Sequence, residues 1–170
     1  IHAAALKQVS TAEYNPGETI KTNVTGTQNL IEASLNNNVK KIIALSTDKA
    51  ASPLNLYGAT KLCAEKLIVS ANNIRGNRSI NFSVIRYGNV LNSRGSIIPL
   101  LNNIGDDDRK EYFTLTHRDM TRFVMTLEQS VDLIEYAILN GYTGDTVIPE
   151  LISMKLIDLL ELFSEKYNKP

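Results

Sequence analysis

The chain alternates between two hydrophobic spacings, one typical of helices and one typical of buried strands. A helical face is predicted after residues 15–17, where residues recur every three or four positions at Ile20, Val24, Thr27, Ile31 and Leu35. Three asparagines at 36–38 should end this helix. Residues 39–45 then predict a buried strand, because they are largely aliphatic and include β-branched side chains.

The same alternation continues through the middle of the chain. A second helix is predicted from Tyr57 to about Asn72, with its core stripe at Ala59, Cys63 and Leu67. The next strand is predicted at 80–86, and Gly88 and Gly95 mark the loop that follows it.

The last third of the chain carries clearer helix boundaries. The charged stretch 105–111 predicts a solvated surface loop. Thr126 and Gln129 have the spacing of a capping box, and Gly141 stands where that helix should end. A short strand is predicted at 147–148, and Ser153 is predicted to cap a last helix, whose core side would be Leu156, Leu159, Leu160 and Phe163.

Helices that alternate with short apolar strands predict an α/β fold, a Rossmann-like doubly wound parallel sheet. Such sheets bind ligands at the carboxyl ends of their strands. Two polar stretches, 46–49 and 86–95, fall at predicted strand ends of this kind.

Composition excludes several other classes of protein. Basic and acidic residues are equal at 18 each, so no basic field favours nucleic acid. No apolar run approaches the length of a membrane span, so we expect no membrane partner. The single Cys63 excludes an internal disulfide framework and a cysteine-built zinc site, and no metal site is expected. A reducing, cytoplasmic setting is the natural interpretation.

Tyr57 and Lys61 are the first candidate chemical groups. They lie four residues apart and therefore share one helical face. An ammonium group beside a phenol stabilises the phenolate and lowers the phenol's pKa, which would make Tyr57 a base for a sugar hydroxyl. The plainer interpretation is a surface Tyr and Lys on an amphipathic helix, and for this spacing alone it is the more common one.

The residues before that helix favour the chemical interpretation. Ser46 and Thr47 end the predicted strand, where small hydroxyl side chains can face a ligand. Asp48 and Lys49 follow at once, and an acid beside a base suits a reaction that moves two protons. For Asp48 and Lys49 alone, a salt-bridged loop would be the ordinary interpretation.

The stretch "LSTDKAASPLNLYGATK" at 45–61 resembles the extended short-chain dehydrogenase/reductase family, and within it the UDP-N-acetylglucosamine 4,6-dehydratases that invert C5. Four further stretches carry the resemblance over nearly the whole chain: "HAAALKQV" (2–9), "NPGETIKTNVTGTQNLIEA" (15–33), "RYGNVLNSRGSIIPL" (86–100) and "MTRFVMTLEQSV" (120–131). The combination of these motifs is far more specific than Tyr57 and Lys61 alone.

The resemblance implies a division of labour among the catalytic residues. Tyr57 would take the proton of the C4 hydroxyl, while Thr47 hydrogen-bonds near the C4 oxygen and Lys61 holds the nicotinamide ribose. Lys49 would remove the C5 proton, and Asp48 would protonate the departing C6 hydroxyl. The product would be a 4-keto-6-deoxy sugar of L configuration.

Binding residues follow from the same resemblance. The cofactor, NADP with NAD as the alternative, would lie beside Ala3, Ala4, Tyr57, Lys61, Tyr87 and Gly88. The UDP-sugar would contact Lys7, Asn89, Ser93, Arg94 and, more weakly supported, Arg122. His2 and Asn23 are expected to support the site without reacting.

The resemblance also implies an organisation. Residues 1–95 are expected to be the C-terminal portion of an NADP-binding Rossmann domain, and 96–170 the remaining Rossmann elements with part of a small substrate-binding region. The chain starts without Met and lacks a glycine-rich phosphate turn, so we expect about half of an enzyme, with the first strands and the C-terminal part outside it. A homo-oligomer is expected by resemblance.

Two other functions stay open on the sequence. A nucleotide-sugar 4-epimerase of this fold would need Tyr57 and Lys61 but no acid/base pair, so Asp48 and Lys49 favour dehydration. A non-catalytic nucleotide-sugar-binding domain would not require Thr47, Tyr57 and Lys61 together.

Overall fold

The computed structural model describes residues 1–170 and divides them into two compact units. The first unit contains Ile1–Tyr87 and Val131–Pro149, and the second contains Gly88–Ser130 and Glu150–Pro170. The chain therefore passes between them three times. Whether the first unit is a Rossmann domain proper and the second a substrate-binding region stays a prediction.

The first unit is built on a parallel sheet. Its strands are β1 (Lys41–Thr47), β2 (Asn81–Tyr87) and β5 (Thr146–Val147), in the order β1-β2-β5. His2 adds a parallel bridge to Ala44 on the free side of β1, with backbone bonds of 2.8 Å to Ile43 and 2.9 Å from Leu45. All the strand pairs run parallel, which confirms the predicted Rossmann-like α/β fold.

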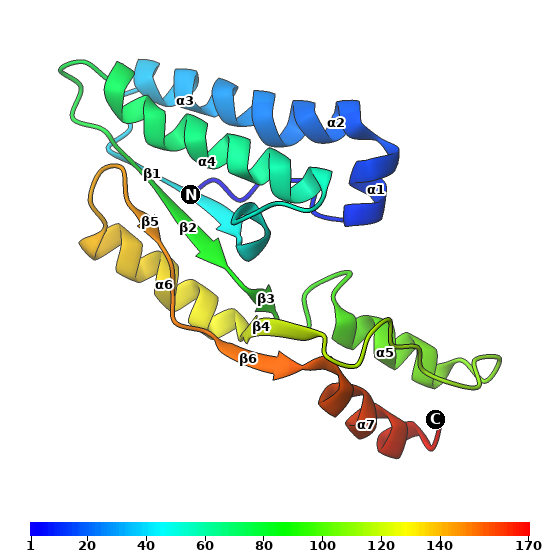
Figure 1. Cartoon of the computed structure of the whole chain (residues 1–170). Coiled ribbons are helices and arrows are strands. Elements are labelled where there is room, and N and C mark those ends of the chain that lie inside the picture. The colour runs from blue at the N-terminus through cyan, green and yellow to red at the C-terminus, as the bar shows by residue number, and fades with distance from the viewer. The chain divides into compact units, whose positions relative to one another are not determined.

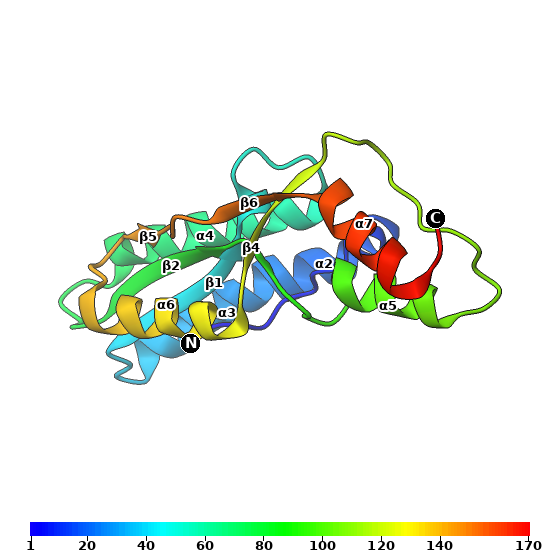
Figure 2. The ribbon, with the colours of Figure 1, turned by 90° about the horizontal axis from the view of Figure 1, so that it is seen from below.

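Helices cover both faces of this sheet (Figures 1 and 2). The chain enters through α1 (Val9–Tyr14) and α2 (Pro16–Ile20). A π-helical segment at Lys21–Thr25 then leads into α3 (Gly26–Asn36), which packs with α4 (Leu56–Ile74) on one face; the residues buried there include Ile31, Ala44, Ile68, Ala71, Phe82 and Val84. On the other face, Ala137 of α6 (Leu127–Asn140) packs against Ile43 and Ile85.

The second unit has its own small sheet. β3 (Asn89–Val90) pairs in parallel with β4 (Thr121–Met125), and β4 pairs antiparallel with β6 (Ile152–Lys155). Two helices, α5 (Ile97–Asp106) and α7 (Leu156–Tyr167), complete it. The Lys169 ammonium joins their ends by donating to the carbonyls of Gly105 at 2.7 Å and Asp107 at 3.0 Å.

Two predicted helix boundaries are confirmed and one is wrong. The Thr126 amide donates to Gln129 Oε1 at 2.8 Å and the Gln129 amide to Thr126 Oγ1 at 3.1 Å, which is the reciprocal capping box at the start of α6. Gly141 follows the end of α6 as predicted. Ser153 caps no helix, because it lies inside β6 and the last helix begins at Leu156.

The two predicted helical stripes are confirmed only in part. Thr27 and Ile31 are buried, and Leu35 and Leu67 pack against the core, but other predicted positions are exposed. Ile20 is 44% exposed and Cys63 is exposed, while Thr19 and Asn23, which lie outside the predicted stripe, are buried on the first helical run. On α4 the buried positions include Thr60, Lys61, Ala64, Glu65, Ile68 and Ala71. Their polar side chains find hydrogen-bond partners inside the fold, so the core side of each helix is partly polar and does not follow the apolar pattern.

The charged stretch is a loop only in part. Gly105 and Asp106 belong to α5, and Gly105 is buried against the Tyr167 ring, where a Cβ would come within 2.5 Å. Beyond them, Asp107 and exposed Arg109 form an ion pair of 2.8 Å.

Candidate active site

The strongest concentration of reactive side chains lies where β1 ends. β1 finishes at Thr47, and a single 3-10 turn, Asp48–Ala50, follows directly. The Thr47 hydroxyl donates to Asp48 Oδ1 at 2.8 Å and accepts from the Lys49 amide at 3.4 Å. This local bonding turns the chain sharply, so that three consecutive polar side chains stand at the carboxyl end of a core strand.

Asp48 and Lys49 form an ion pair within this turn. Lys49 Nζ lies 3.0 Å from Asp48 Oδ1, and both side chains are partly buried. The same oxygen accepts from the Lys49 amide at 2.9 Å and from Thr47, so one carboxylate oxygen receives three hydrogen bonds. Moving one proton along the Lys49–Asp48 bond would give an amine and a carboxylic acid side by side.

Tyr57 reaches the same place from the first turn of α4. Asn55 caps that helix, its side chain accepting from the Gly58 amide at 2.9 Å. Tyr57 is hydrogen-bonded to the Thr47 side chain. Burial raises the pKa of the Tyr57 phenol above its usual value, the hydrogen bond to Thr47 lowers it, and the charge of Asp48 raises it further.

Gly58 fixes how closely α4 approaches the turn. A Cβ at this position would lie 2.4 Å from the Lys49 carbonyl oxygen and 3.1 Å from Pro53 Cβ. Only glycine permits this distance without a shift of the backbone. The close approach keeps Tyr57 beside Thr47, Asp48 and Lys49.

Lys61 lies one turn after Tyr57 and is 6% exposed. Its ammonium donates to the Leu45 carbonyl of β1 at 2.6 Å. Burial lowers the pKa of Lys61, and the charge of Glu65 raises it. The sequence predicts that Lys61 lowers the pKa of Tyr57; in this structure the Tyr57 pKa is raised, because burial outweighs the groups around the phenol.

The segment before α1 lies along the free side of β1. Ala3 and Ala4 are exposed there, next to the His2 bridge. His2 Nε2 lies 3.1 Å from Thr27 Oγ1, and burial lowers the pKa of its imidazole, with the charge of Lys61 as the second cause. Small exposed residues next to His2, which feels the charge of Lys61, leave an open surface on which a nicotinamide riboside could lie.

Asn23 holds this segment against α4. Its amide nitrogen donates to the Leu6 carbonyl at 2.9 Å and to Thr60 Oγ1 at 3.0 Å, and its oxygen accepts from the Leu6 amide at 2.8 Å. Asn23 lies in the π-helical segment and is 1% exposed. These bonds agree with the supporting role expected for Asn23.

Tyr87 ends β2 and is the cross-strand partner of Thr47 in the parallel register. Burial raises the pKa of Tyr87 to about 12. The next residue, Gly88, belongs to the second unit, where a Cβ would come within 2.6 Å of Leu151 and 3.0 Å of the Phe123 carbonyl oxygen. Packing within that unit therefore accounts for the glycine.

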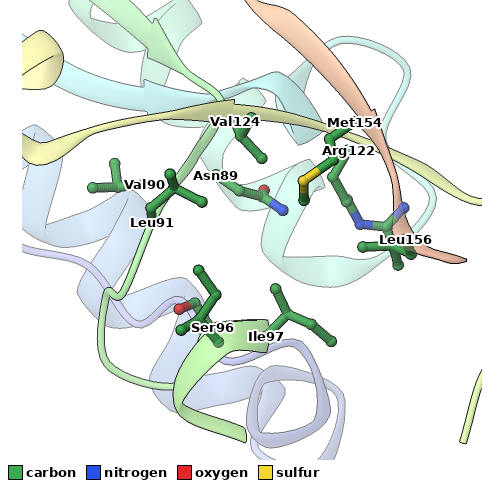
Figure 3. Close-up of a pocket in the computed structure, with 10 residues that line it drawn as sticks. Asn89, Val90, Leu91, Ser96, Ile97, Arg122, Val124, Met154 and Leu156 are labelled. Carbon is green, nitrogen blue, oxygen red and sulfur yellow. The ribbon is translucent and has the colours of Figure 1, made fainter. Parts of the chain in front are cut away.

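Asn89 and Arg122 line a pocket of the second unit (Figure 3). Most other lining side chains are apolar, and they come from β3, β4, β6, α5 and the segments beside them: Val90, Leu91, Ile97, Ile98, Val124, Met154 and Leu156. The Ser96 hydroxyl, which also lines the pocket, is buried without a hydrogen-bond partner. The accessible volume of the pocket is about 10 Å³, which is room for about one water molecule.

The remaining predicted binding residues lie outside these two groups. Lys7 is exposed in the first unit, while Ser93 and Arg94 lie in the turn between β3 and α5 of the second unit, where Arg94 is exposed. The structure thus brings together Thr47, Asp48, Lys49, Tyr57 and Lys61 in one unit, and Asn89 and Arg122 in the other.

Sequence reasoning missed the ion pair of Glu65 and Arg86, which is described below. Glu65 stands four residues after Lys61, and Arg86 stands just before Tyr87, but 21 residues separate the two partners. The i+4 spacing from Lys61 was the one available signal, and it does not identify the partner on β2.

A parallel sheet covered on both faces, with Thr47, Tyr57 and Lys61 gathered at a strand end, defines the extended short-chain dehydrogenase/reductase class. The family model described as "Polysaccharide biosynthesis protein" matches residues 1–169, and the chain belongs to this family.

Curated proteins that are similar to this chain have several different names, as three of them show. A UDP-N-acetylglucosamine 4,6-dehydratase (inverting) of Campylobacter jejuni is 52% identical over 159 residues, 94% of this chain and 47% of that protein. A UDP-glucose 4-epimerase of Rickettsia rickettsii is 43% identical over 167 residues, 98% of this chain and 48% of that protein. An uncharacterized membrane protein of Methanocaldococcus jannaschii is 50% identical over 97% of this chain and 49% of that protein. The chain spans about half the length of these relatives.

Solved structures give the same picture of the fold. Pen from Bacillus thuringiensis superposes with a TM-score of 0.93 at 43% identity, over 99% of this chain and 52% of that one. At 17% identity, a dTDP-glucose 4,6-dehydratase of Streptomyces venezuelae with NAD and TYD bound has a TM-score of 0.86 over 99% of this chain and 57% of that one. RMD of Pseudomonas aeruginosa with NADPH, also 17% identical, has a TM-score of 0.80 over 99% of this chain and 64% of that one.

None of the helices has the length and apolar composition needed to cross a membrane.

Proposed function

We propose that the protein is a nucleotide-sugar 4,6-dehydratase that converts UDP-N-acetylglucosamine to a UDP-4-keto-6-deoxy-hexose with inversion at C5. The observation that carries this proposal is the convergence of a phenol, a carboxylate and an amine, from Tyr57, Asp48 and Lys49, around the Thr47 hydroxyl at one strand end. The Campylobacter relative supports it by its name and by its 52% identity.

Tyr57 and Thr47 would act at C4 of the sugar. Their hydrogen bond places both hydroxyl groups at one point, where Thr47 would orient the C4 oxygen and Tyr57 would take its proton. A bound NADP or NAD would supply the acceptor and later the donor of the hydride, and its positive ring would favour the phenolate. Lys61, Ala3, Ala4, Tyr87 and Gly88 are the residues proposed to hold it.

Asp48 and Lys49 would carry out the elimination. A ketone at C4 acidifies the C5 proton, which the Lys49 amine would remove. The C6 hydroxyl would leave as water with the proton of the Asp48 carboxyl. One proton transfer across the 3.0 Å contact prepares both groups at once, because it converts the ion pair to the amine and the acid.

The nucleotide would be bound mainly by residues of the second unit. Asn89 and Arg122 line the second unit's pocket, and guanidinium groups such as those of Arg94 and Arg122 suit phosphate oxygens. Lys7 and Ser93 complete the proposed UDP-sugar contacts. A homo-oligomer is part of the same proposal.

The assay that tests the function uses the full-length protein in deuterated water with UDP-N-acetylglucosamine, followed by proton and carbon NMR. Dehydration gives a new C6 methyl group and deuterium at C5. The proposal fails if the sugar is unchanged while a bound nicotinamide nucleotide is released on denaturation, or if only the C4 epimer forms.

A 4-epimerase is the second candidate, supported by the Rickettsia relative. It would use Tyr57, Thr47 and Lys61 in the same way and would leave C5 and C6 untouched. The same spectra separate the two, because epimerisation gives the galacto isomer with no methyl signal and no deuterium at C5. A non-catalytic nucleotide-sugar-binding domain would give neither product.

Lys49→Ala tests the acid/base pair within the leading proposal. We expect methyl formation to fall by about 10²–10⁴-fold, because no other group would remove the C5 proton, while the released nicotinamide nucleotide stays at the wild-type amount. Lys66→Ala, at an exposed position on α4, is the matched control and should keep wild-type turnover. Undiminished methyl formation in the Lys49 variant would remove this residue from the mechanism.

A further inference from the structure

An ion pair between buried Glu65 and partly exposed Arg86 joins α4 to β2, the two elements that also carry residues of the proposed active site. Arg86 Nε donates to Glu65 Oε1 at 2.9 Å, and Arg86 Nη2 donates to Glu65 Oε2 at 2.7 Å. Glu65 is 5% exposed. Two parallel bonds between a guanidinium and a carboxylate fix the relative position of the two side chains as well as their charges.

This pair is attached to the proposed site at both ends. Glu65 stands four residues after Lys61, on the same buried face of α4. Arg86 immediately precedes Tyr87 on β2 and stands opposite Ser46 in the strand register. The pair therefore connects the helix that carries Tyr57 and Lys61 to the strand beside Thr47.

Lys61 needs a negative partner if it is to act as an ammonium. It is buried, and the one hydrogen bond that its Nζ makes goes to a neutral carbonyl, that of Leu45. Burial lowers the pKa of Lys61, and Glu65 is the group whose charge raises it. Arg86 shares that carboxylate, so Lys61 and Arg86 compete for one negative charge.

We propose that Glu65 and Arg86 are a positioning pair, in which Glu65 keeps Lys61 charged and in place and Arg86 limits how much of the Glu65 charge Lys61 feels. This proposal rests on the function proposed above and adds to it that the Lys61 ammonium favours the Tyr57 phenolate, as the sequence analysis expects. Neither Glu65 nor Arg86 is among the residues proposed to contact the sugar or the cofactor, so they would act through Lys61.

Few other charges face this group. His2, from the segment beside β1, has a lowered pKa, because of its burial and, second, because of the charge of Lys61. The neighbouring π-helical segment and α3 contribute uncharged side chains, Asn23 and Thr27. β1 contributes the Leu45 carbonyl and the buried Ser46 hydroxyl.

Removing the charge of Glu65 and removing the charge of Arg86 should shift the Lys61 pKa in opposite directions. Glu65→Gln leaves two cations without the carboxylate, so the Lys61 pKa should fall. Arg86→Gln frees the Glu65 carboxylate for Lys61, so the Lys61 pKa should rise. A purely structural role would make both variants lose stability without opposite shifts in titration.

Lysine titration gives a readout that does not require turnover. The full-length protein is labelled with ¹³Cε-lysine, and Lys61→Arg identifies the Lys61 signal by its loss. We expect the Lys61 midpoint to move down by at least about one pH unit in Glu65→Gln and up in Arg86→Gln. Glu65→Asp keeps the charge and should stay close to wild type.

Activity gives the second readout. The acid limb of the kcat/KM profile should move to higher pH in Glu65→Gln, because a less charged Lys61 favours the Tyr57 phenolate less. It should move to lower pH in Arg86→Gln. Exposed Glu32→Gln and Arg78→Gln are the matched controls and should leave the profile unchanged.

The two proposals fail in different ways. If wild-type protein forms no dehydrated product, the proposed function is wrong, while the lysine titration still tests the pair. If all folded variants give the same Lys61 midpoint, or shift it in the same direction, the positioning proposal is overturned even when the wild type is active.

Discussion

Asp48 concentrates three hydrogen bonds on a single carboxylate oxygen, Oδ1. Those bonds come from Thr47, from the Lys49 backbone and from the Lys49 ammonium, so they orient the carboxyl group without help from distant residues. Because the orienting bonds are local, the proposed acid and base keep their geometry wherever the strand end is well packed.

Gly58 is the residue at which this geometry is most easily broken. We predict that Gly58→Ala destabilises the protein by about 1–3 kcal/mol, because its Cβ would meet the Lys49 carbonyl oxygen at 2.4 Å and the backbone must shift. Turnover should fall further than stability alone explains, since the shift moves Lys49. Urea unfolding and methyl formation in the NMR assay measure the two effects.

Gly17→Ala is the matched control for this substitution. No atom lies within 4 Å of the position where its Cβ would be, so the substitution should leave stability and turnover within experimental error. Equal behaviour of the two variants would contradict the role assigned to Gly58.

At the scale of elements, the π-helical segment Lys21–Thr25 carries one side chain that binds two neighbouring segments. It carries Asn23, which bonds to both backbone groups of Leu6 and to Thr60 of α4. The segment beside β1 and the helix that bears Tyr57 are thereby joined through one residue.

Asn23→Leu should therefore cost more than an ordinary surface change. We expect the free energy of unfolding to fall by about 1–3 kcal/mol, because the Leu6 amide and carbonyl would lose their partner. Asn37→Leu, at an exposed position where only one bond to Ala33 is lost, should cost less than about 0.5 kcal/mol. Chemical denaturation of both variants decides the matter; similar losses would show that the buried bonds contribute little.

The sequence predicts elements well where the signals are local. The capping box of Thr126 and Gln129 needs only residues three apart, and Asp48, Lys49 and Tyr57 come together across one turn and one helix start. The stripes on α3 and α4 could not be predicted in the same way. Asn23, Glu65 and Lys61 are buried because of partners 16 to 37 residues away, and hydrophobic periodicity contains no information about those partners.

At the scale of the whole molecule, stability should depend on pH through the tyrosines. The pKa of Tyr87 is raised to about 12, against 10.0 in the unfolded chain. Between these values the unfolded state has lost a proton that the folded state keeps, so the free energy of unfolding falls as pH rises. Below pH 10 both states are protonated, and the contribution is fully present.

Tyr87→Phe should weaken this alkaline loss. We predict a shallower decline of the free energy of unfolding between about pH 10 and 12 in the variant than in the wild type, measured by urea unfolding. The lowered pKa of Lys61 makes the free energy of unfolding rise with pH up to pH 10.5, and the raised pKa of Tyr57 makes it fall, as Tyr87 does. Both effects occur in the wild type and in Tyr87→Phe, so they cancel when the two proteins are compared. Tyr14→Phe, at an 86% exposed position, is the control and should decline like the wild type. If Tyr87→Phe also declines as steeply as the wild type, Tyr87 is not the source of the alkaline loss.

The one-turn segment Asp48–Ala50 has a consequence for how reactions diversify on this scaffold. It stands between a finished strand and a helix that has its own cap, so its two ionisable side chains can be exchanged while both neighbours stay folded. On the function proposed above, exchange of that pair would remove the elimination and leave the chemistry at C4 in place.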